Sequence, residues 1–151
     1  MSSLAVRELV KEFLDDNSDE TIVDISAEYE ELRDLLSQYD LQPDAPWLGL
    51  QFIGDSELPV SLAATNDKGL YRETGSIILH IVAQARIGVQ NSMLARGEAL
   101  RDLFRGARIE AIVVEGVTPV NFGAGSTLEF EGGYVSGSIT ISYHFDMSPQ
   151  T

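Results

Sequence analysis

Apolar and small polar residues alternate along residues 135–145, and this alternation constrains the fold more than any other feature of the chain. The apolar positions are Val135, Gly137, Ile139, Ile141, Tyr143 and Phe145, and the polar positions are Ser136, Ser138, Thr140, Ser142 and His144. A period of two residues is typical of a strand with one buried face and one polar face. The preceding Gly132-Gly133 is a hairpin turn dipeptide. We therefore expect this segment to be a strand of an antiparallel sheet.

Segments with helical or strand periodicity precede this strand. Apolar residues recur at helical spacing over 3–14, 26–39 and 89–105, and at strand spacing over 47–54, 76–86 and 109–114. We expect residues 54–69 to form a long irregular connection with room for a short strand near 58–62. We expect residues 116–126 to form a glycine-rich loop. This order predicts an α+β fold with a single mainly antiparallel β-sheet and helices packed on one face.

The length of 151 residues fits one domain. We expect a single domain over 1–151, with the N-terminal helices in 3–39 and the sheet and third helix in 47–146.

The chain is strongly acidic and contains no cysteine. It has 10 Lys and Arg against 24 Asp and Glu, a formal net charge of −14. Such a surface repels phosphate, which disfavours specific nucleic-acid binding and anionic membranes. No apolar run reaches the ~18 residues of a membrane span, and charged residues interrupt any N-terminal signal sequence. We expect a soluble cytosolic product without thiol chemistry, disulfides or cysteine-ligated metal.

The charge is divided unevenly along the chain. Residues 1–70 carry 16 acidic and 4 basic side chains. Residues 71–151 carry 8 acidic and 6 basic side chains, and all six basic ones are arginine.

The third predicted helix has two residues that do not fit its amphipathic pattern. Arg96 projects into its apolar arc, which requires a buried carboxylate or a neighbouring subunit, and Leu94 lies on its charged side. Together with Trp47 and Phe122, which flank expected loops, these features favour an oligomer.

Motifs for catalysis, cofactors or metals are incomplete. Asp15, Asn17 and Asp19 match the first ligands of a calcium loop, but the glycine and the bidentate glutamate that should follow are missing. Gly123-Ala124-Gly125 lacks the third glycine and the lysine of a phosphate loop. The serines near glycines in 133–138 lack the spacing of a nucleophile elbow.

The two histidines leave one enzymatic alternative. His80 and His144 are both predicted on polar strand faces, and they could approach each other beside Glu129 if their strands were neighbours. Solvated surface histidines are the commoner case. We therefore expect no catalytic residue, no cofactor and no metal site, and no enzyme.

Four segments resemble the tail terminator proteins of long-tailed bacteriophages. They are the strand ETGSIILHIVAQARIG, the helix NSMLARGEALRDLFRG, the strand RIEAIVVEG and the hairpin TLEFEGGYVSGSITISYHFD, mainly within residues 72–146. The N-terminal helix SSLAVRELVKEFLDD also fits the opening helix of that family. The resemblance implies a structural virion protein that forms a hexameric ring on the head-proximal end of the tail. Such a ring caps the tail tube, ends its polymerisation and provides the head-joining surface.

The resemblance also implies partners and surfaces. The partners would be other copies of the chain, the tail tube protein and a head–tail connector or neck protein, in the virion and, during assembly, in the host cytoplasm. DNA would pass through the ring without specific binding. Candidate subunit-interface residues are Arg96, Arg101, Arg105, Arg108 and Leu94, and the candidate lumen or inter-ring face consists of Ser136, Ser138, Thr140 and Ser142.

Two non-enzymatic alternatives stay open. The first is a head–tail joining or other minor tail protein. The second is a small monomeric or dimeric α+β ligand-binding module, which predicts a deep apolar pocket and no ring.

Overall fold

Three long strands form the centre of the structure. The computed structural model describes residues 4–18, 21–24, 46–59, 71–84, 88–122 and 134–147. The elements are α1 (Leu4–Asn17), β1 (Ile22–Asp24), β2 (Trp47–Pro59), β3 (Tyr71–Gln84), α3 (Val89–Phe104), β4 (Arg108–Ile109), β5 (Ile112–Val117), β6 (Asn121–Phe122) and β7 (Tyr134–Met147). The predicted helix at 26–39 and the predicted turn at Gly132-Gly133 lie outside the described residues.

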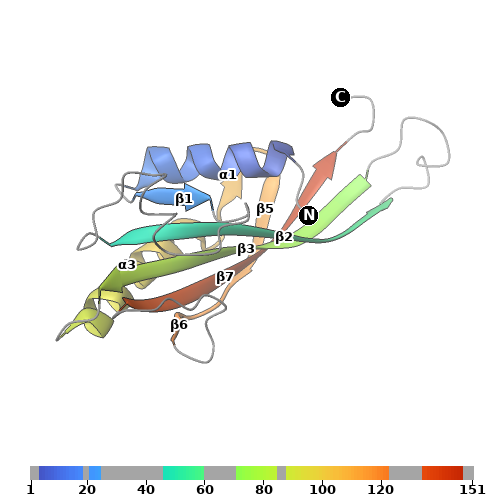
Figure 1. The fold of residues 1–151 in the computed structure, drawn as a ribbon. Coiled ribbons are helices and arrows are strands. Elements are labelled where there is room, and N and C mark those ends of the chain that lie inside the picture. The colour runs from blue at the N-terminus through green and yellow to red at the C-terminus, as the bar shows by residue number, and fades with distance from the viewer. Residues whose placement is uncertain are drawn as a thin grey trace.

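The sheet is a strongly curled half-barrel, so the predicted fold class is wrong. Its strands follow the order β1-β2-β3-β7-β5-β4, and β6 pairs with β7. The β1–β2 pair is parallel and the other pairs are antiparallel. Figure 1 shows the long strands twisting as they cross the molecule, so that the sheet is no flat layer.

Two irregularities add to the normal twist of the sheet. The β2–β3 register shifts between Gly54 and Ser56, and the β5–β7 register shifts between Val114 and Gly116. An extra residue in one strand bends that strand and increases its local twist. Alternation along one strand predicts its two faces but carries no information on such bends, so the sequence pattern does not predict the curl of the sheet.

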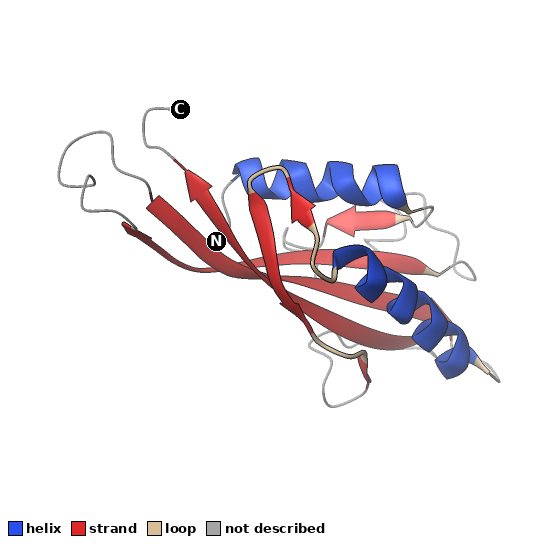
Figure 2. Ribbon diagram, turned by 180° about the vertical axis from the view of Figure 1, so that it is seen from behind, coloured by secondary structure: helices blue, strands red, loops and turns tan. Residues whose placement is uncertain are grey.

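Both described helices belong to one hydrophobic core with the strands. Helix α1 buries Val6, Val10 and Leu14, and α3 buries Val89, Met93, Gly97, Leu100 and Phe104. The rings of Phe13 and Phe104 meet edge to face with their centroids 5.2 Å apart, so the two helices touch each other. Figure 2 shows α3 in front of the long strands and α1 above them, along the top of the view. The periodicity predictions for α1 and α3 are confirmed.

The predicted alternation in β7 is confirmed, and its apolar side chains form part of the core. Ile139 and Ile141 are fully buried and Tyr143 is 1% exposed, all three within the core cluster. They pair across the ladder with Leu79, Ile77 and Gly75 of β3.

Two strand boundaries differ from the prediction. Strands β2 and β3 do not end at residue 54 or begin at residue 76; they pair as far as Pro59 and Tyr71. The bulge at Gly54 lets the ladder continue through sequence that resembles a loop. The single strand predicted over 109–114 is a hairpin, β4 and β5, that turns at Glu110 with a φ of 54°.

Tyr143 lies in the core at the point where β3 closely approaches β2 and β7. Its hydroxyl donates a hydrogen bond of 2.7 Å to Oε2 of Glu73, which is 6% exposed. The close approach requires glycine at position 75. A Cβ there would lie 2.5 Å from the carbonyl oxygen of Ile53 and 2.8 Å from the Tyr143 hydroxyl.

Gly75→Ala should therefore destabilise the protein by about 1–3 kcal/mol, the usual cost of overpacking a well-packed core. Chemical denaturation of the variant and the parent measures the difference. Gly116→Ala is the matched control, because a Cβ at this strand glycine meets nothing within 4 Å. Equal losses of stability in the two variants would contradict the close approach at Gly75.

Candidate functional site

The outer face of α3 carries the predicted interface residues. The helix turns its apolar side into the core, which leaves Leu94 39% exposed on the other side. Leu94, Glu98, Arg101 and Arg105 follow one another at intervals of three or four residues and so form one stripe along the helix. We call these four residues the α3 stripe.

Arg101 lies in the last turn of α3, Arg105 directly follows the helix, and Arg108 begins β4. Nη1 of Arg101 lies 2.8 Å from Oε1 of Glu98, and Nη1 of Arg105 lies 3.6 Å from Oδ1 of Asp102. Both ion pairs join residues three positions apart in the sequence. Nε of Arg108 donates to the carbonyl oxygen of Glu110 at 3.2 Å. Both side chains of the Arg105–Asp102 pair are exposed, and such a pair contributes little to stability, about 0–1 kcal/mol, so Arg105 can change partner at small cost. The Arg101 side chain is only 16% exposed.

Arg96 differs from the other arginines. It is half-buried and has an interaction partner within the chain. This partner within the chain accounts for an arginine in the apolar arc, so Arg96 does not require a neighbouring subunit.

The polar face of β7 is only partly open to solvent. Ser142 is exposed, and Ser136 and Thr140 are half-buried. Ser138 is 5% exposed and pairs in register with the fully buried His80. Of the four residues predicted for a lumen or inter-ring wall, Ser138 is therefore not available at the surface of this chain.

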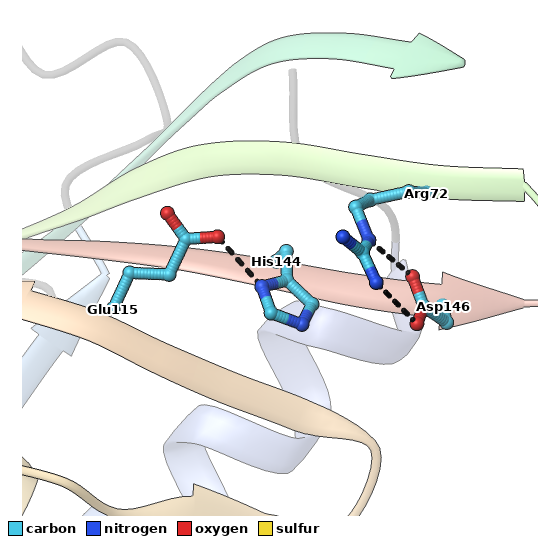
Figure 3. Close-up of polar contacts among 4 residues, drawn as sticks. All are labelled: Arg72, Glu115, His144 and Asp146. Carbon is cyan, nitrogen blue, oxygen red and sulfur yellow. Dashed lines mark hydrogen bonds and ion pairs between the residues drawn. The ribbon is translucent and has the colours of Figure 1, made fainter. Parts of the chain in front are cut away.

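Two polar contacts occupy the far half of the same sheet face (Figure 3). Nε and Nη2 of Arg72 donate to the two carboxylate oxygens of Asp146 at 2.7 and 3.0 Å, in a directly opposed cross-strand pair. Nδ1 of His144 lies 2.6 Å from Oε1 of Glu115. Glu115 lies at the bulge of β5, between the paired residues Val114 and Gly116. The carboxylate beside His144 is Glu115, and Glu129, named from the sequence as an example of such a carboxylate, lies outside the described residues.

The Arg72–Asp146 pair changes the titration of both groups. The hydrogen bond from Arg72 lowers the pKa of the Asp146 carboxyl below its usual value, and the same bond raises the pKa of the Arg72 guanidinium. Both side chains are more than a third exposed, so solvent screens the pair. We interpret it as a cross-strand contact that fixes the register of the sheet edge.

His80 is buried, and its predicted place on a solvated face is wrong. Its relative exposure is 0%, with Trp47 and Val82 also buried on this side of the sheet. Its Nε2 lies 3.0 Å from Oε1 of Gln51. Burial lowers the pKa of His80 to about 4, because a charged imidazolium is poorly solvated there.

The two histidines do not converge. Strands β3 and β7 are neighbours, as the enzymatic alternative required, but His144 pairs with Thr74 and His80 pairs with Ser138. Six residues along a strand separate these positions, about 20 Å at 3.3 Å per residue. No joint catalytic or metal site forms from this pair.

The other motifs give no site in the described part of the chain. Asp15 and Asn17 belong to the last turns of α1, not to a loop, and Gly123-Ala124-Gly125 lies outside the described residues. No group of three or more metal-binding side chains occurs within the described ranges. None of the described helices is long and apolar enough to cross a membrane.

A pocket of about 420 Å³ opens where α3 begins. It is lined by Gly88, Val89, Gln90, Asn91 and Val135, so two amide side chains form much of its wall. This is not the deep apolar pocket that a ligand-binding module predicts.

No family model matches the chain, and no curated protein matches it at a significant level of sequence similarity.

The buried His80 predicts a specific pH dependence. The neutral ring is favoured in the folded state, so the unfolded chain binds the extra proton first as the pH falls below 6.5, the ordinary pKa of a histidine side chain. Stability should therefore fall between pH 6.5 and pH 4, by up to about 3 kcal/mol from this group. His80→Gln should remove this part of the slope.

Urea denaturation of both proteins from pH 7.5 to pH 4 measures the effect. The difference at pH 7.5, where both side chains are neutral, gives the packing cost of the substitution alone. Parallel pH curves for the two proteins would contradict the burial of a neutral His80.

Proposed function

We propose that this protein is a structural component of a bacteriophage tail. It forms a hexameric ring that caps the head-proximal end of the tail tube, ends tube polymerisation and offers the head-joining surface. Other copies of the chain, the tail tube protein and a connector or neck protein are its partners, in the virion and in the host cytoplasm during assembly. Its role is assembly and not catalysis.

The observation that carries this proposal is the outer face of α3. The helix is anchored in the core by its inner side, while an exposed leucine and two arginine ion pairs, one of them fully on the surface, lie on its outer side. Arginine among apolar side chains is a typical composition of protein interfaces. A closed ring needs such a patch and a different, complementary patch on the same subunit.

The charge of the chain also supports the proposal. DNA that moves through a tail must not adhere to its wall, and a subunit of net charge −14 repels the phosphate backbone. The exposed hydroxyl of Ser142 and the partly exposed Ser136 and Thr140 offer small, uncharged groups for a wall or an inter-ring contact. The sequence segments that resemble tail terminators lie mainly in residues 72–146, which contain α3 and β7.

A head–tail joining or other minor tail protein is the neighbouring alternative. It would use the same outer face of α3 toward a different protein and would not close into a ring alone. Imaging of the purified protein separates the two proposals.

Negative-stain electron microscopy at high protein concentration, with and without magnesium, tests the ring. We expect annular particles with sixfold symmetry, about 99 kDa for six copies of 16.5 kDa. The annular fraction should increase with salt or magnesium, because screening confines the repulsion between acidic subunits to about 10 Å at 0.1 M. Particles of another symmetry, or monomers at every salt and magnesium concentration, would contradict the ring.

A further inference from the structure

We propose that α1 of one copy docks, parallel, along the α3 stripe of the next copy, with Leu4 beside Leu94 and the carboxylates at the end of α1 beside Arg105. This inference rests on the proposed ring, because it supplies the complementary patch that ring closure requires. The occupant of the α3 stripe is thus a second copy of this chain.

Helix α1 presents an acidic outer face. Its buried side chains are Val6, Val10 and Leu14. The residues on the opposite side are exposed; they are Leu4, Ala5, Glu8, Glu12, Asp15 and Asp16. The last four of them are acidic. The two basic residues of the helix are half-buried at its flank, where the guanidinium of Arg7 lies 5.2 Å from the ring centre of Phe52. The outer face of α1 is therefore negative along its whole length.

Each of the two helices carries an exposed leucine at the start of its outer face. Leu4 is 70% exposed and Leu94 is 39% exposed; with Ile53 at 41% they are the exposed large hydrophobic residues of the described part of the chain. Covering Leu4 and Leu94 against each other removes apolar surface from water, which favours association. Ile53 lies on β2, away from both stripes.

The spacing of the two stripes matches when the helices run parallel. Leu4 precedes Asp15 by the same eleven residues that separate Leu94 from Arg105. At 1.5 Å per residue both intervals are about 16 Å. In this register the leucines meet at one end, Asp15 meets Arg105 at the other, and Glu8 lies opposite Glu98, whose charge is balanced by its ion pair with Arg101. An antiparallel arrangement would place Leu4 against Arg105 and Asp15 against Leu94, which pairs apolar groups with charges.

Arg105 can accept a new carboxylate partner. It is 58% exposed and its ion pair with Asp102 is long, at 3.6 Å. Arg101 is only 16% exposed and is already paired with Glu98 through Nη1, so it keeps its partner in the docked arrangement. Opposed charges of this kind fix register and partner choice more than they add affinity.

The same contact repeats around a ring. Within one subunit α1 already touches α3 through Phe13 and Phe104. If α1 of each copy also lies along α3 of the next, the helices alternate α1, α3, α1, α3 around the assembly. The interface uses two different patches, so it does not end at a two-fold dimer, and it closes into a ring where the rotation between neighbouring copies is one sixth of a turn.

Cysteine cross-linking tests the contact directly, because the chain has no cysteine of its own. Leu4→Cys and Leu94→Cys are mixed in equal amounts with magnesium and oxidised. We expect the mixed disulfide dimer to form roughly tenfold or more faster than either variant pairs with itself, since docking raises the effective concentration of the two thiols. Ile53→Cys is the matched control, with an exposure similar to that of Leu94, and should react with Leu4→Cys at the background rate. Equal rates for all pairs would overturn the proposed contact.

The cross-linking separates this inference from the proposed ring. Sixfold rings in the microscope without preferential Leu4–Leu94 cross-linking would support the ring and overturn the α1–α3 contact. In the double variant Leu4→Cys/Leu94→Cys, a ladder of oxidised products that ends at six copies supports both. A ladder that continues beyond six supports the contact and contradicts the hexamer.

Charge reversal tests the polar end of the contact in the same assay. Arg105→Glu, placed on the Leu94→Cys chain, should slow the mixed disulfide by roughly tenfold, and Asp15→Arg/Asp16→Arg on the Leu4→Cys chain should restore it. Thr21→Glu/Asn121→Glu changes two exposed residues and gives the same change of net charge as Arg105→Glu. This control should leave the rate unchanged. Identical rates for the reversed and control chains would overturn the pairing of Asp15 with Arg105.

Discussion

The antiparallel ladder between β3 and β7 is the interaction on which the rest of the structure depends. It joins the two strands in unbroken register from Tyr71 opposite Met147 to Gln84 opposite Tyr134. Because the side-chain period of a strand is two, this register decides which residues enter the core and which face outward. A shift by one residue would expose Ile139 and Ile141 and bury their polar neighbours. Strands β2 and β5 then add to the two sides of this pair.

The position of α3 follows from that ladder. Gly97 faces Val120 so closely that a Cβ would overlap it, which brings the middle of the helix against the segment after β5. With its inner side fixed in this way, the helix can present only its opposite side to a partner. The exposed Leu94 and the arginine pairs are therefore consequences of core packing, and the same packing fixes the helix backbone that carries them. Rigid interfaces lose less conformational entropy on assembly.

Sequence periodicity predicts the helices and the polarity of β7, but it does not predict burial on the second face of the sheet. His80 lies in an alternating pattern typical of a half-solvated strand, yet it is buried with Trp47. Its partner Gln51 comes from a strand 29 positions earlier. Likewise Arg72 and Asp146 are 74 residues apart in sequence and form a bidentate contact. Such pairs depend on register between strands, which no local pattern encodes.

The sequence by itself determined the elements that depend on near neighbours: the inner faces of α1 and α3, the alternation of β7, the i,i+3 ion pairs and the uneven charge. Side chains two, three or four residues apart share a face by backbone geometry alone. Only the tertiary structure decided the curl of the sheet, the continuation of β2 and β3 through a bulge, the burial of His80 and its distance from His144. These properties result from pairing and packing between distant segments, whose free energy is gained only when the whole sheet closes around its core.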